Sequence, residues 1–199
     1  YKARLVAKGF HQEAGLDYLE TFSPVVKHTI VRVVLKVAAS NGWSLRQLDV
    51  KNAFLHGVLH EEVYMAQPPG FQDPQYPNHV CKLHKAIYGL KQAPRAWFDT
   101  FTSQLLQLQF VQSSADHSLF IRSTGSSITY LLLYVDDIIL TGNDTSFLHN
   151  LIQQLSSSFE MKDLGCLHYF LGIEVSSHSR GIFLHQSKYL SDLLHKASM

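Results

Sequence analysis

The chain has 199 residues, of which 46% are apolar, and it carries a formal net charge of +1. This composition is ordinary for a globular protein with one substantial core or two small ones. It excludes repeat and low-complexity proteins, because the sequence has no internal period, charge block or biased linker. The net charge alone does not indicate a nucleic-acid binder, although residues 1–51 hold eight Lys and Arg against four acids.

Hydrophobic periodicity predicts a mixture of helices and short strands. Four helices are expected. The first is 29–40, with Thr29 as its cap, and the second begins at Pro94. The third runs to 159 and is capped by Asp144 or Thr145, and the fourth is 187–196. The expected strands are 45–50, 119–122, 128–135, 138–140 and 182–185. Residues 66–79 hold four of the six prolines and form a loop. Because the central hairpin must be antiparallel, the predicted fold class is α+β.

Two adjacent carboxylates, Asp136 and Asp137, stand between two apolar runs. The pattern predicts a strand, a tight turn and a second strand, with the acids at the tip. Like charges in an apolar setting repel each other and lose hydration, which is tolerable mainly when a cation binds there. The apolar stretch 128–140 is shorter than the roughly 18 residues of a membrane span and contains both acids. We therefore expect a buried hairpin that holds a divalent metal.

A third acid, Asp49, ends the alternating strand pattern and completes a candidate metal site. Mg²⁺ prefers oxygen ligands and keeps positions for water or substrate phosphates. Two such ions about 4 Å apart stabilise both the attacking and the leaving oxygen of a phosphoryl transfer. Because successive strand residues face opposite sides, we expect Asp136 to be the main ligand and Asp137 the lesser one. The alternative is a structural cation, or acids that merely form a turn.

Five ordered blocks give the chain a resemblance to a known family. The blocks are LDVKNAFLHG (48–57), AIYGLKQAPRAWF (86–98), YVDD (134–137), FEMKDLG (159–165) and YFLGIEV (169–175). They resemble the reverse transcriptase domain of copia-like long-terminal-repeat retrotransposon Pol polyproteins. The resemblance implies an RNA-directed and DNA-directed DNA polymerase with the palm and fingers of a right hand. It places fingers and palm, interleaved, in about residues 1–185 and the start of a truncated thumb in about 186–199.

The resemblance also implies roles for individual residues. Phe54 is expected to be the aromatic gate that packs under the sugar and excludes a 2′-hydroxyl. The expected catalytic residues are Asp49, Asp136 and Asp137, and the expected metal ligands are these three acids with the main-chain carbonyl of Val50. The expected primer grip, which holds the primer end, is Leu171 and Gly172. The expected nucleotide-binding residues are Phe54, Gln92, Lys91, Arg4 and Lys162.

The implied cofactor is Mg²⁺, as two ions, with Mn²⁺ as an alternative. The implied partners are an RNA template, a DNA primer/template duplex and deoxynucleoside triphosphates, with integrase and ribonuclease H segments in the parent polyprotein. The chain starts and stops inside patterns, which favours a piece of a longer protein. Its isolated thiols, Cys81 and Cys166, and the absence of a signal peptide predict an intracellular, cytoplasmic protein without a membrane partner. The resemblance further implies a location within virus-like particles.

Two alternatives stay open at this point. One is another palm polymerase such as an RNA-dependent RNA polymerase, against which Phe54 argues because it offers no group for a 2′-hydroxyl. The other is a degenerate, non-catalytic transposon remnant that binds nucleic acid. His56 and His60 have helical spacing but lack the order of a zinc motif, so surface histidines are expected. Trp97 is expected in the core rather than stacked on bases.

Overall fold

The computed structural model describes residues 4–178 and 181–197. The chain forms two compact units, and each consists of two separate segments. The first unit comprises Tyr1–Pro24 and Asn52–Gln109, and the second comprises Val25–Lys51 and Phe110–Met199. Helices and strands are mixed, and all pairings between the named strands are antiparallel. The predicted α+β class with antiparallel sheets is therefore confirmed.

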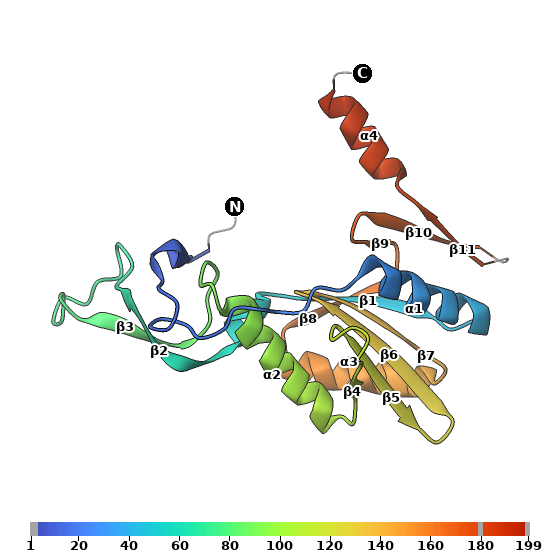
Figure 1. Ribbon diagram of the computed structural model, residues 1–199, viewed down its shortest axis with the longest axis horizontal. Coiled ribbons are helices and arrows are strands. Elements are labelled where there is room, and N and C mark those ends of the chain that lie inside the picture. The colour runs from blue at the N-terminus through green and yellow to red at the C-terminus, as the bar shows by residue number, and fades with distance from the viewer. Residues whose placement is uncertain (1–3, 179–180, 198–199) are drawn as a thin grey trace. The chain divides into compact units, whose positions relative to one another are not determined.

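The second unit is built on a six-stranded sheet with the order β4-β5-β6-β7-β1-β8. In that order the strands are Val111–Gln112, Leu119–Thr124, Ser127–Tyr134, Asp137–Gly142, Leu45–Val50 and Met161–Cys166. Strand β1, which comes much earlier in the chain than its neighbours, lies between β7 and β8 (Figure 1). The predicted strands in this sheet are confirmed. Strand β8 was not predicted, because its sequence MKDLGC does not alternate and contains Asp and Gly.

The β6–β7 hairpin has the predicted tight tip. Tyr134 pairs with Asp137, so Val135 and Asp136 form a two-residue turn. Val135 has a φ of 54°, which lies in the left-handed region that β-branched residues rarely adopt. This unfavourable backbone conformation lies at the tip of the hairpin, directly before Asp136 and Asp137.

Two helices cover the two faces of the sheet (Figure 1). Helix α1 (His28–Asn41) packs with Leu132 and Ile139 in one core cluster. Helix α3 (Thr145–Ser158) buries its own leucines and contacts β7 and β8. Because both faces are covered, residues 131–133 and 138–140 are at most 2% exposed. Double-sided burial explains the unbroken apolar runs on both sides of the acids.

The start of α1 differs from the prediction. Its N-cap residue is Lys27 and no side chain caps it, so the predicted cap at Thr29 is wrong because Thr29 already lies in the first turn. Instead, the main-chain N–H of Lys27 donates to Oδ2 of Asp116 at 3.0 Å. Asp116 is 6% exposed and comes from the loop between β4 and β5. A long-range contact, invisible to local pattern analysis, fixes this helix end.

A smaller sheet of β9 (Tyr169–Phe170), β10 (Ile173–His178) and β11 (Gly181–His185) also belongs to the second unit. Phe170 and Val175 join the core cluster of α1. Helix α4 (Ser187–Lys196) follows, as the sequence predicted, and buries none of its residues.

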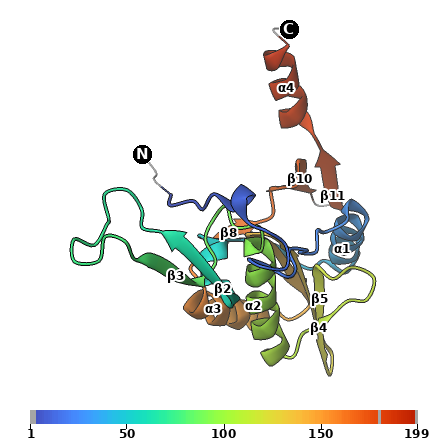
Figure 2. The ribbon, with the colours of Figure 1, turned by 60° about the vertical axis from the view of Figure 1, so that its left-hand side comes forward.

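The first unit contains helix α2 (Ala93–Gln107), the 3-10 helices η1 (Gly9–His11) and η2 (Ala53–His56), and a hairpin of β2 (Val58–Ala66) and β3 (Val80–Lys85). Figure 2 shows the hairpin as a long two-stranded ribbon. The hairpin was not predicted, but its connection is the predicted proline-rich loop. Trp97 is 1% exposed, so its expected place in the core is confirmed.

One glycine allows η2 to lie directly on α2. A Cβ atom at Gly57 would meet the main-chain nitrogen of Trp97 at 2.7 Å. The absence of a side chain at Gly57 thus lets the segment that carries Phe54 pack against the helix that follows Gln92.

We expect Asp144→Ala to destabilise the second unit by about 1 kcal/mol, because Asp144 caps α3. Its Oδ1 accepts a hydrogen bond from the main-chain N–H of Phe147 at 2.9 Å, as the sequence predicted. Urea unfolding followed by circular dichroism measures the loss. Asn150→Ala is the control, because Asn150 is exposed in the middle of the same helix. Equal stability of the two variants would contradict the capping role.

Candidate active site

The strand register brings the three predicted acids together. Asp49, the fifth residue of β1, pairs directly with Asp137, the first residue of β7. Residues directly opposite in an antiparallel pair point to the same side of the sheet. Asp136 lies in the adjoining turn, where its carbonyl accepts a hydrogen bond from the main-chain N–H of Val50 at 2.8 Å. Main-chain pairing therefore joins acids that are far apart in the sequence.

The sequence predicted that Asp136 is the main metal ligand and Asp137 the lesser one, on the assumption that both residues alternate within one strand. In the structure Asp136 is in the turn, and it is Asp137 that lies across from Asp49. The register thus gives the shared side of the sheet to Asp137. Which of the two acids holds more of the metal stays a prediction.

Lys162 extends the row of charged residues across the sheet. It lies on β8 and pairs with Asp49 from the other side of β1. Asp137, Asp49 and Lys162 consequently occupy one row across three neighbouring strands. The main-chain N–H of Lys51 donates to the carbonyl of Glu160 at 2.8 Å, and their side chains form an ion pair of the same length. This cross-strand pair ties β1 to the segment that leads into β8.

The electrostatics of the acids confirm that they influence one another. Burial raises the pKa of the Asp137 carboxyl, and the negative charges of Asp136 and Asp49 raise it further. A hydrogen bond with the side chain of Gln47 opposes these effects and lowers the pKa. Sequence reasoning missed Gln47, because an amide on an alternating strand carries no motif of its own.

The donor set has the chemical character that a hard divalent cation requires. It consists of carboxylate oxygens whose mutual repulsion a cation relieves. As the side chains stand, however, residues 4–178 and 181–197 contain no group of three or more His, Cys, Asp or Glu arranged to hold a metal ion. The kind of ligand therefore fits Mg²⁺, while a closed coordination sphere is not present.

In the first unit, Phe54 and Arg4 lie against the same ring. The Phe54 and Tyr88 ring centroids are 4.8 Å apart, and the Arg4 guanidinium carbon lies 5.2 Å from the Tyr88 centroid. Tyr88 thus links two residues of the expected nucleotide-binding set, which came from separate parts of the sequence. Tyr88 lies inside a quoted sequence block, but nothing in the sequence assigned it this role.

Gln92 and Lys91 are held by the segment 12–18. Gln92 is 2% exposed, its Nε2 donates to the carbonyl of Asp17 and its Oε1 accepts from Nε2 of Gln12, both at 2.9 Å. Nζ of Lys91 donates to the carbonyl of Gln12 at 2.9 Å and lies 5.2 Å from the Tyr18 ring centroid. Both residues therefore have internal partners, which the sequence did not reveal.

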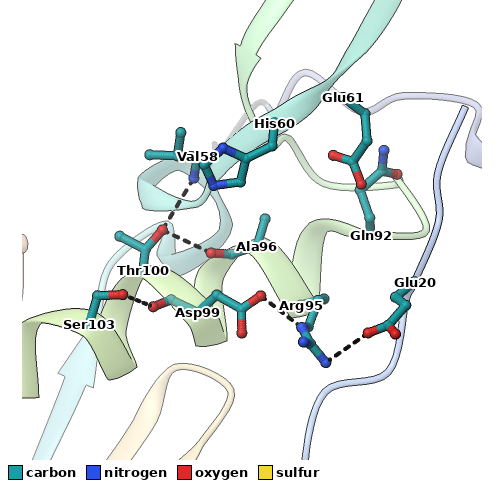
Figure 3. A pocket seen from close by; sticks show the side chains of 10 residues that line it. All are labelled: Glu20, Val58, His60, Glu61, Gln92, Arg95, Ala96, Asp99, Thr100 and Ser103. Carbon is teal, nitrogen blue, oxygen red and sulfur yellow. Dashed lines mark hydrogen bonds and ion pairs between the residues drawn. The ribbon is translucent and has the colours of Figure 1, made fainter. Parts of the chain in front are cut away.

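A pocket of about 300 Å³, lined by several charged side chains, lies beside Gln92 (Figure 3). Arg95 forms ion pairs with Asp99 at 2.7 Å and with Glu20 at 3.3 Å. Figure 3 shows the guanidinium between the two carboxylates. Two carboxylates therefore already neutralise the positive charge of Arg95 in this pocket.

The expected primer-grip residues form the tip of a hairpin. Leu171 and Gly172 connect β9 to β10 and have φ angles of 50° and 80°. Positive φ at both central residues is the geometry of the tight type I′ class of hairpin turn. The Gly172 carbonyl accepts a hydrogen bond from Nε2 of Gln186 at 3.2 Å. The turn is thus fixed to the residue that precedes α4.

Comparison with known proteins identifies the class. The family model described as Reverse transcriptase (RNA-dependent DNA polymerase) matches residues 1–199, and the chain belongs to this family. It is 57% identical over 199 residues to the Retrovirus-related Pol polyprotein from transposon RE1 of Arabidopsis thaliana. It is 45% identical over 202 aligned positions to that from transposon TNT 1-94 of Nicotiana tabacum. The predicted relation to copia-like retrotransposon Pol polyproteins is confirmed.

Both matches cover the whole of this chain, but only 14% and 15% of the relatives. A further relative, the Putative transposon Ty5-1 protein YCL074W of Saccharomyces cerevisiae, is 35% identical over 67% of this chain and 44% of its own length. No solved structure matches the chain. Across the described residues, no helix has the length and apolar character needed to span a membrane.

We expect Asp137→Asn to stabilise the fold at neutral pH in metal-free buffer. The folded state raises the pKa of Asp137, so it binds the proton more tightly than the unfolded state does. The stability that Asp137 contributes is therefore fully present below the unfolded pKa, near 3.8, and is lost as the pH rises through the higher folded pKa. Urea unfolding in EDTA across this range measures the difference. A stabilisation that grows as the pH falls would contradict the assignment.

Proposed function

We propose that the chain catalyses template-directed DNA synthesis. In this reaction the 3′-hydroxyl of a primer attacks the α-phosphate of a deoxynucleoside triphosphate and releases pyrophosphate. The observation that carries the proposal is the pairing of Asp49 with Asp137 next to Asp136, in a chain that belongs to the reverse transcriptase family. RNA and DNA templates are both proposed substrates.

We propose that Asp49, Asp136 and Asp137, with the carbonyl of Val50, hold two Mg²⁺ ions, for which Mn²⁺ can substitute. When bound, these ions supply Lewis-acid activation of the hydroxyl and neutralise charge on the phosphates. The repulsion among the carboxylates supports this role, because a bound cation relieves it at a pH where the acids are ionised. The acids contribute position and negative charge, and they need not exchange protons with the substrate.

The remaining expected residues bind and orient the substrates in this proposal. Lys162 neutralises the leaving pyrophosphate, which its place beside Asp49 supports. Phe54 packs under the sugar, and Arg4 approaches the triphosphate. Leu171 and Gly172 present main chain to the primer end, which their position at the tip of a tight hairpin supports.

Gln92 binds the nucleotide only after a change of partners, and Lys91 binds beside it. The amide of Gln92 is buried and fully engaged by the segment 12–18, so this segment must shift before Gln92 can contact a ligand, whereas the exposed ammonium of Lys91 keeps a further donor. We propose that nucleotide binding exchanges these internal hydrogen bonds for contacts with the substrate. Internal bonds replaced one for one cost little net free energy.

We further propose that the second unit is the palm and the first unit the fingers, with α4 at the start of a thumb. The supporting feature is that each unit consists of two alternating chain segments. The proposed setting is the retrotransposon Pol polyprotein, beside integrase and ribonuclease H segments, in cytoplasmic virus-like particles. Similarity to two transposon Pol polyproteins supports this setting.

We expect Asp49→Asn and Asp136→Asn to abolish nucleotide addition, because an amide keeps the shape but removes the charge that holds the ions. Asp137→Asn should be milder, because Asp137 is proposed to be the lesser of the two adjacent ligands. Primer extension on a homopolymer RNA template, with and without Mg²⁺, measures the activity, and circular dichroism checks the fold. Asp73→Asn, in an exposed loop of the first unit, is the control. Near wild-type extension by Asp49→Asn would overturn the proposed site.

We expect Phe54→Ala to admit ribonucleotides, because removing the ring opens space for the 2′-hydroxyl. The ratio of kcat/KM for ribonucleotides over deoxynucleotides should rise about 10- to 100-fold, as for other steric discriminations by a packed side chain. Phe71→Ala is the control, because Phe71 is 83% exposed in the same unit. An unchanged ratio in Phe54→Ala would show that another residue selects the sugar.

A further inference from the structure

Gln47 lies on the same side of β1 as Asp49, two residues earlier in the strand. Its register partner on β7 is Ile139, which makes Asp137 its diagonal neighbour. Diagonal neighbours on one face of an antiparallel pair lie about 7–8 Å apart at Cα, within reach of a long side chain. The register therefore places the Gln47 amide within reach of the Asp137 carboxylate, and a hydrogen bond between them would lower the pKa of that carboxyl, against the effects that raise it.

The chemistry of an amide suits this position. A Lys or Arg here would orient the carboxylate equally well, but it would also neutralise the charge and compete with a cation. A Gln carboxamide donates through its NH₂ group and carries no charge, so it fixes one carboxylate oxygen and leaves the attraction for a cation intact. An amide at this position can therefore orient the carboxylate of Asp137 without neutralising its charge.

Asp137 needs such support because of its place at the start of β7. The turn before it begins with Val135, whose backbone is left-handed, and the like-charged Asp136 and Asp49 lie next to it in the chain and directly across from it in the sheet. Without a donor beside it, the carboxylate would rotate away from the other two acids toward solvent. The face that it shares with Ile139 and Leu45 belongs to the apolar core, which provides no alternative hydrogen-bond partner from those two side chains.

We propose that Gln47 is a positioning residue of the active site, which holds one oxygen of Asp137 so that the other faces the cation shared with Asp49. This inference rests on the proposed function. It adds a residue that acts through Asp137 and touches neither substrate nor metal. Partners of this kind typically change metal affinity about 10- to 100-fold when removed.

The first experiment measures Mn²⁺ binding to the 199-residue chain by electron paramagnetic resonance, without nucleic acid or nucleotide. We expect Gln47→Leu, which keeps the size but removes the donor, to raise the Mn²⁺ dissociation constant about tenfold. We expect Gln47→Glu to bind more weakly than wild type as well, because it replaces the donor by a repelling carboxylate. Unchanged affinity in Gln47→Leu overturns the inference, and so does a wild type that binds no Mn²⁺.

A matched control is available in the same sheet. Gln112 lies on β4, and its Nε2 donates to the carbonyl of His117 at 2.7 Å. Gln112→Leu therefore removes a comparable amide hydrogen bond, with β5, β6 and β7 between it and β1. We expect Gln112→Leu to leave Mn²⁺ affinity unchanged. If both leucine variants lose affinity equally, the effect is a general loss of structure and the positioning role is wrong.

A double-mutant cycle separates this inference from the proposed function. In an Asp137→Asn background, Gln47→Leu should add less than a twofold further loss of Mn²⁺ affinity, because the carboxylate that it positions is absent. Additive losses overturn the inference. In primer extension, Gln47→Leu should lower kcat and raise the Mg²⁺ requirement while KM for the nucleotide stays within twofold. If the wild type binds Mn²⁺ through this pair but extends no primer, the proposed function fails and the positioning role stands.

Discussion

The pairing of β1 with β7 is the constraint on which the candidate site depends. A strand register is set by main-chain hydrogen bonds and by the alternation of buried side chains, so it cannot shift by one residue without exposing the core. Here the same register that buries Leu48 and Ile138 brings Asp49 opposite Asp137. The apolar residues of the hairpin thus determine the position of the charged ones.

The site combines strong packing with unfavourable local interactions. Residues 138–140 are fully buried directly after a pair of adjacent carboxylates and a left-handed Val135. Backbone strain of this kind costs about 1–3 kcal/mol and persists only where the surrounding structure enforces it. The core beneath the hairpin therefore stabilises an arrangement that the tip alone would not adopt, which is the general relation between a rigid scaffold and a functional site.

Much of the fold could be predicted from the sequence, because apolar periodicity marks elements that pack against a core. The hairpin at residues 128–140, the cap at Asp144 and the helix 187–196 are examples. Long-range contacts could not be predicted. The anchor of α1 on Asp116 and the insertion of β1 between β7 and β8 depend on residues far apart in the chain.

In the candidate site, too, the sequence predicted some residues and missed those whose roles depend on long-range contacts. The motifs identified the three acids, because paired carboxylates in an apolar run need a chemical explanation. The sequence did not identify Gln47, Tyr88 or Gln12, since an amide or a ring acquires a role only through the neighbour that folding gives it. Alternation within one strand also did not show that Asp136 lies in the turn, while Asp137, the first residue of β7, lies across from Asp49.

The hydrogen bond between Gln12 and Gln92 gives the chain a way to tune affinity at a distance. Any ligand that binds the Gln92 amide competes with Gln12, so its apparent affinity equals the intrinsic affinity multiplied by the fraction of molecules in which that bond is open. A substitution in the segment 12–18 can change this fraction without touching the ligand. Related chains can therefore differ in the concentration of ligand at which they respond, even when every ligand-contacting side chain is identical.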